Sequence, residues 1–116
     1  ILMLKVAPLG GINRSLQLAA HHKLPIVVSS ALESVVGISH GLKLAAHVPE
    51  LKYACGLATG ALMTEDLGQI PIINGAMSVG TYEPDLERLE RFKVSDERLE
   101  WWRNRLTEVW NLRGAQ

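Results

Sequence analysis

Three short apolar runs, separated by segments with helical periodicity, constrain the fold of this chain more than any other feature. The runs are residues 1–6, 26–29 and 53–57. Between them, apolar residues recur at helical spacing over residues 12–23 and 30–46. Near-continuous apolar runs are typical of strands covered on both faces, and connections of this length join parallel strands. The pattern therefore predicts a strand–helix–strand–helix–strand unit of an α/β fold, which occurs in doubly wound sheets and in (β/α)8 barrels.

The ends of these segments carry local signals of their own. Gly10 and Gly11 follow the first run and predict a tight turn before the first helix. Ser30 and Glu33 have the spacing of a capping box, in which each side chain accepts a hydrogen bond from the other residue's backbone N–H. This box predicts that the second helix begins near Ser30, and Pro49 is expected to close it.

The rest of the chain predicts a hairpin and two helices. Residues 70–73 and 76–79 are apolar and flank an Asn-Gly pair, which is the strongest short signal for a hairpin turn. A short charged helix is expected over 84–92, and a longer one begins at the N-cap Ser95 and runs to about Leu112. This longer helix carries one apolar stripe, which we expect to serve in packing rather than in ligand binding: Leu99, Trp102, Leu106 and Trp110.

Composition excludes several classes of protein. Twelve basic residues balance twelve acidic ones among 116 residues, whereas general binding of nucleic acid needs a basic surface. The single cysteine, Cys55, rules out an intrachain disulfide and fits a reducing compartment, so we expect a cytoplasmic location. No apolar run approaches the roughly 18 residues of a membrane span, and neither HExxH nor CxxC occurs, so neither a membrane nor a zinc site is expected.

Three strands with two-sided burial cannot cover themselves. A barrel needs roughly 250 residues, more than twice the 116 present. The chain also opens at Ile1 inside an apolar run, where a free terminus is usually polar. We therefore expect the chain to be a piece that begins within a domain, with the remaining strands supplied elsewhere.

Polar residues at the ends of the first two runs are the candidate site. Lys5 lies near the carboxyl end of the first run, where α/β folds place their sites, and a lysine there can act as acid, base or fixed cation. Ser29 and Ser30 end the second run on the same side and, with the following helix N-terminus, can hold a carboxylate. The alternatives are a solvent-reaching Lys5 and a Ser30 that only caps the helix.

The sequence resembles the o-succinylbenzoate synthases of the enolase superfamily, closest to the actinobacterial branch. The resemblance rests on LKVAPLGG (4–11), VVSSALESVVG (27–37), YACGL (53–57) and WWRNRL (101–106), in the family's order and spacing. It implies the C-terminal part of an enolase-type (β/α)8 barrel, with the first three apolar runs as strands six, seven and eight. Residues 1–69 would then belong to the barrel, and 70–116 would hold the hairpin returning to a capping domain and the charged C-terminal helices.

The resemblance also implies a reaction. The family dehydrates 2-succinyl-6-hydroxy-2,4-cyclohexadiene-1-carboxylate to o-succinylbenzoate in menaquinone synthesis, with Mg²⁺ as cofactor. Its base and its three metal ligands lie on strands two to five, so they are outside this chain, and no metal ligand is expected here. Lys5 corresponds to the sixth-strand lysine opposite the base. The resemblance assigns the following residues to binding of a small carboxylate substrate: Ser29, Ser30, Ala31, Gly56 and Leu57. The expected partner is the remainder of the same enzyme.

Two alternatives stay open at this point. N-succinylamino acid racemases share the two lysines but often read GGMLETG where this chain reads SSALESV (29–35), which favours the synthase. A non-catalytic α/β fragment that binds a partner through the unpaired edge of its first strand is the other alternative.

Overall fold

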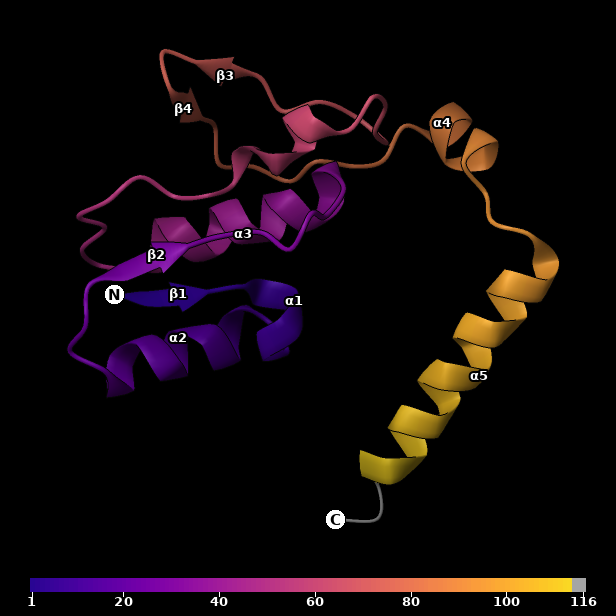
Figure 1. Cartoon of the computed structure of the whole chain (residues 1–116), viewed down its shortest axis with the longest axis horizontal. Coiled ribbons are helices and arrows are strands. Elements are labelled where there is room, and N and C mark those ends of the chain that lie inside the picture. Colours follow the sequence, from indigo (N-terminus) through magenta and orange to yellow (C-terminus); the bar gives the residue numbers. More distant parts are fainter. Residues whose placement is uncertain (114–116) are drawn as a thin grey trace.

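Two parallel strands lie at the centre of the fold, and the computed structural model describes residues 1–113 around them (Figure 1). Strand β1 (Leu2–Leu4) pairs in parallel with β2 (Ile26–Val28). The predicted strand over 53–57 is wrong in extent, because this segment forms only one parallel bridge, between Ser29 and Gly56. Among residues 1–113, no further strand pairs with the side of segment 53–57 that faces away from β2. The second ladder of hydrogen bonds that would make this segment a full strand is therefore absent. The mixed α/β character is confirmed.

The first strand is shorter than its apolar run predicts. It ends at Leu4, and residues after Lys5 form the short helix α1 (Val6–Leu9). Pro8 fits there because the first turn of a helix has no use for its missing N–H. The predicted turn is confirmed: Gly10 and Gly11 have φ angles of 85° and 117°, which glycine adopts without strain.

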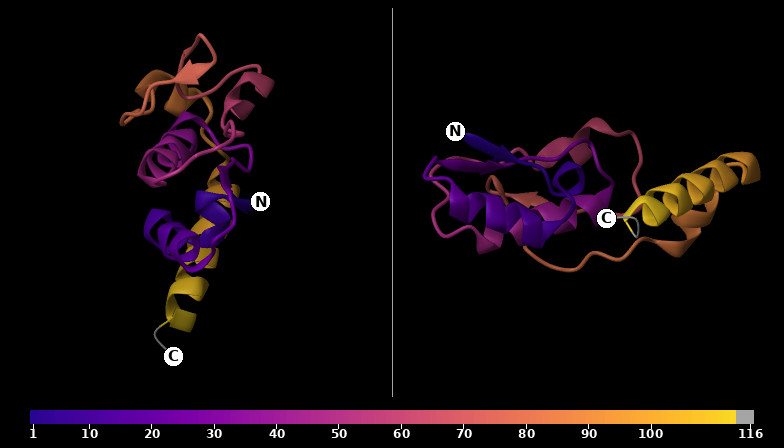
Figure 2. Two further views of the ribbon diagram at one scale, coloured as in Figure 1. Left: turned by 90° about the vertical axis from the view of Figure 1, so that its left-hand side faces the viewer. Right: turned by 90° about the horizontal axis from the view of Figure 1, so that it is seen from below.

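Two longer helices cover one side of the strands (Figure 2). They are α2 (Ile12–His21) and α3 (Val35–His47), close to the helices predicted from periodicity. The core between them and the strands consists of Leu4, Ile26, Val28, Ile38, Leu42, Leu44, Val48 and Leu57. On β1, by contrast, Met3 stays 58% exposed. The sheet therefore has one covered and one open face within the described residues.

The predicted capping box at the start of α3 is wrong. The helix begins at Val35, and the side chain of its N-cap, Ser34, makes no capping hydrogen bond. The backbone N–H of Val35 donates instead to Oδ2 of Asp66, at 2.8 Å. The side chains of Ser30 and Glu33 are engaged elsewhere, as described below.

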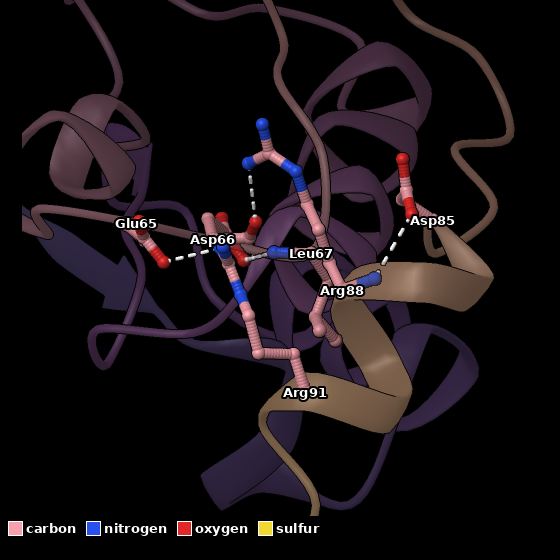
Figure 3. A network of polar contacts seen from close by, with 6 residues as sticks. All are labelled: Glu65, Asp66, Leu67, Asp85, Arg88 and Arg91. Carbon is pink, nitrogen blue, oxygen red and sulfur yellow. Dashed lines mark hydrogen bonds and ion pairs between the residues drawn. The ribbon is translucent and has the colours of Figure 1, made fainter.

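Asp66 also joins the loop after α3 to helix α4 (Leu86–Arg91). Figure 3 shows its second carboxylate oxygen accepting from the N–H of Leu67, while Arg88 donates to its backbone carbonyl at 2.9 Å. Arg91 forms an ion pair with Glu65 beside it. These contacts fix the segment that connects a 3₁₀ helix (Ala58–Leu62) to the hairpin.

The hairpin is confirmed, although its strands are short. Strand β3 (Ile72–Ile73) pairs antiparallel with β4 (Ala76–Met77). Asn74 and Gly75 between them have φ angles of 51° and 78°. Positive φ at both central residues is what a tight two-residue hairpin turn requires.

The C-terminal helix α5 (Asp96–Arg113) extends away from the body of the molecule (Figure 1). Its predicted N-cap is confirmed, since Ser95 Oγ accepts from the N–H of Arg98. The radius of gyration is 16.1 Å, whereas a compact chain of this length has about 13 Å. The extended helix accounts for this difference.

The predicted packing of the α5 stripe does not occur within residues 1–113. No residue of α5 is buried, and Leu106 and Trp110 are 68% and 72% exposed. The reason is that the described chain places no apolar surface opposite the stripe. No helix within residues 1–113 combines the length and apolar composition that crossing a membrane requires.

Candidate functional site

Lys5 lies directly after β1, one residue beyond the strand in which the sequence predicts it. Its backbone is still extended, with φ −128° and ψ 119°, and it forms the N-cap position of α1. The side chain is partly buried, and its ammonium donates a hydrogen bond to the backbone carbonyl of Ser30 at 2.7 Å. An ammonium has three donors, so two remain available to other groups.

Ser29 links the first strand to the third apolar run. Its N–H donates to the carbonyl of Leu4 at 2.9 Å, which continues the β1–β2 ladder. On the other side it bridges to Gly56, where a Cβ would come within 2.9 Å of Ser29 Oγ. Glycine at 56 therefore allows the close approach of the two segments, and Lys5, Ser29 and Gly56 lie at one edge of the fold.

Ser30 is buried, and both of its polar backbone groups are used. Its N–H donates to the carbonyl of Gly56 at 3.0 Å, and its carbonyl accepts from Lys5. The hydroxyl is hydrogen-bonded to that of Thr59. Thr59 is absent from the sequence-based candidates, although a hydroxyl residue just past the third apolar run is a signal for such a role.

Ala31 is exposed, and its N–H is also engaged. It donates to Oε2 of Glu33 at 2.7 Å, so a carboxylate already occupies this backbone donor. The Glu33 side chain therefore bonds Ala31 and not the N–H of Ser30 that a capping box requires. The sequence predicts Glu33 as a helix cap. The structure places it instead beside a cluster formed by Lys5, Ser30 and Thr59, which we call the Lys5 cluster.

Leu57 points away from this edge. Its side chain is 3% exposed and lies in the hydrophobic core, against Gly41 of α3. It also lines a cavity of about 450 Å³ between the start of α3 and the hairpin, together with Val35, Met63, Asp66 and Arg88. Lys5 and residues 29–31 do not line this cavity. Of the site residues predicted from the sequence, only Leu57 therefore lines the cavity, and the others lie outside it.

The described residues do not form a metal site by themselves. Within residues 1–113, no group of three or more histidine, cysteine, aspartate or glutamate side chains is placed to hold a metal ion. Hard cations such as Mg²⁺ need several oxygen ligands, mostly carboxylates.

The parallel strands and the helices beside them define an α/β protein. Lys5 and the hydroxyl of Ser30 lie at the carboxyl ends of these strands, which is where proteins of this class usually have their sites. No family model matches the chain. Among curated proteins, it is 46% identical over 113 residues to an o-succinylbenzoate synthase of Mycobacterium leprae, covering 97% of this chain and 34% of that protein. It is 47% identical over 107 residues to the enzyme of that name from Mycolicibacterium smegmatis, covering 91% and 33%. The o-succinylbenzoate synthase of Mycobacterium tuberculosis is 45% identical over 113 residues, covering 97% and 35%.

The chain is thus homologous to the C-terminal part of o-succinylbenzoate synthases, which confirms the resemblance seen in the sequence. It spans about a third of the length of the curated relatives it matches.

Proposed function

We propose that these residues are the C-terminal part of an o-succinylbenzoate synthase, a carbon–oxygen lyase. The observation that carries the proposal is the 46% identity to a curated synthase over 97% of this chain. In this chain, Lys5 follows the carboxyl end of β1. The activity belongs to what we call the complete enzyme. This is the present chain together with a part equivalent to the other two-thirds of the relatives.

In this proposal, residues 1–69 form the last strands of a barrel, and 70–116 return to a capping domain and end in the charged helices. The parallel β1–β2 pair and the Ser29–Gly56 bridge support it, because within residues 1–113 each of these segments pairs with its neighbours in sequence alone. Both helices lie on one side, as they do on the outside of a barrel (Figure 2). The open edge of β1 is where a preceding strand would pair.

The reaction removes a proton from the carbon next to a carboxylate and a hydroxyl from the neighbouring carbon, so that water leaves and the ring becomes aromatic. Negative charge develops on the carboxylate as the proton departs. The Lys5 ammonium, held by the carbonyl of Ser30, stabilises this charge because it is already fixed beside the substrate. Residues 29–31 and Gly56 form the adjoining wall for the succinyl carboxylate, whereas the side chain of Leu57 packs into the core behind it. The base and the Mg²⁺ ligands belong to the other part of the complete enzyme.

The test is Lys5→Ala in the complete enzyme, assayed with Mg²⁺ for formation of o-succinylbenzoate. We expect a loss of turnover of about 10²-fold or more, as for other fixed charge-stabilising groups, with unchanged circular dichroism. Lys52→Ala is the matched control, because Lys52 is exposed and reaches only Glu50, at 3.8 Å. Near-normal turnover by Lys5→Ala would overturn the assignment of the site.

A further inference from the structure

One peptide group, between Ser30 and Ala31, lies between two charged side chains. Its carbonyl accepts from the Lys5 ammonium at 2.7 Å, and its N–H donates to the Glu33 carboxylate at 2.7 Å. The two bonds use opposite ends of one planar, resonance-coupled unit. A carboxylate at the N–H end polarises that unit and makes the carbonyl a stronger acceptor for the ammonium.

The loop that carries this peptide is built around Glu33. Leu32 has a φ of 65°, a left-handed conformation that side chains other than glycine rarely adopt. Glu33 then packs on the first turn of α3, where a Cβ on Gly37 would lie only 2.4 Å from Glu33 Cβ. The missing side chain at 37 therefore makes room for Glu33, and the strained loop turns its carboxylate back to Ala31.

Helix capping does not explain this arrangement. The first N–H of α3 donates to Asp66, and Glu33 accepts from Ala31. We propose that Glu33 is a positioning residue for Lys5: through the Ser30–Ala31 peptide, its carboxylate holds the carbonyl that fixes the ammonium. This proposal rests on the proposed function, because it assigns to Lys5 the charge that meets the substrate.

Three variants of the complete enzyme test the coupling. Glu33→Ala removes the acceptor, whereas Glu33→Gln keeps a neutral one. Gly37→Ala retains Glu33, but the added Cβ forces its carboxylate away from Ala31. Glu50→Ala is the control, since Glu50 is an exposed carboxylate that contacts only Lys52.

The first readout needs no activity. Lys5 is labelled with trace acetic anhydride, and its acetylation is quantified by mass spectrometry relative to the exposed Lys23. We expect labelling of Lys5 to rise about fivefold in Glu33→Ala and in Gly37→Ala, because the ammonium is less firmly held, and to change less than about twofold in Glu33→Gln. Unchanged labelling in Glu33→Ala would overturn the proposal.

The second readout separates positioning from binding. We expect the kcat of Glu33→Ala to fall about tenfold with KM within about twofold, and Glu33→Gln to recover most of the loss. A kcat for Glu33→Ala equal to wild type, alongside an inactive Lys5→Ala, would refute the role of Glu33 and leave the proposed function standing. A complete enzyme without dehydration activity would refute the proposed function, and the labelling of Lys5 would still decide the coupling.

Discussion

The carboxylate of Asp66 accepts the backbone N–H of Val35 at 2.8 Å, so the start of α3 is capped by a residue 31 positions further along the chain. The same residue receives Arg88 of α4 at its backbone carbonyl (Figure 3). Asp66 therefore connects the helical body to the segment that leads to the hairpin and to α4.

This connection predicts the effect of removing the carboxylate. Asp66→Ala should destabilise the protein by about 1 kcal/mol, the usual cost of losing an N-cap acceptor. Asp66→Asn should recover part of this loss, since its amide oxygen still accepts. Urea denaturation of the variants measures the difference, with the exposed Glu108→Ala as control. Equal midpoints for wild type and Asp66→Ala would contradict the capping role.

Gly41 predicts a second stability effect. A Cβ at this position would lie 2.6 Å from Cδ2 of Leu57, which is held in the core. Gly41→Ala should therefore cost about 1–3 kcal/mol, the range for an overpacked core. Gly60→Ala is the matched control, because its Cβ would meet only Asp66, at an ordinary 3.9 Å. A Gly41→Ala variant as stable as Gly60→Ala would show that Leu57 moves aside at no cost.

The features predicted from the sequence are those decided by neighbouring residues. The Asn74-Gly75 turn and the Ser95 cap need only contacts within a few positions, and both are confirmed. The capping box is wrong because Glu33 bonds Ala31 and a distant carboxylate takes over its role. No local pattern announces Asp66, whose partner lies 31 positions away.

The candidate site is predicted only in part from the sequence. Lys5 and Ser30 were predicted to share one edge because parallel strands end together, and the structure joins them by a hydrogen bond. Thr59 and Glu33 were missed as members of this cluster, because their contacts depend on the loop conformation around Leu32 and on the path of the chain after Gly56. The third strand was overestimated, since an apolar run becomes a strand only beside a paired neighbour.

The hydrogen bond between the hydroxyls of Ser30 and Thr59 predicts coupled mutations. Ser30 is 5% exposed, so removing either hydroxyl leaves the other without its partner. Ser30→Ala and Thr59→Val should each cost about 1 kcal/mol, and the double variant should cost less than the sum by about 0.5–1 kcal/mol. A double-mutant cycle in urea measures this coupling. Strict additivity would mean that the two hydroxyls do not stabilise each other.

The three tryptophans of the chain all lie on α5, so tryptophan fluorescence reports on this helix alone. Trp110 is 72% exposed and Trp101 is 48% exposed. In this chain, a variant that retains only Trp110 should therefore be quenched by acrylamide more efficiently than one that retains only Trp101, with phenylalanine at the other two positions. The order should hold on dilution, because an exposed apolar stripe favours association at high concentration. Equal and weak quenching of both variants at low concentration would mean that the α5 stripe packs against the body of the chain, contrary to the structure.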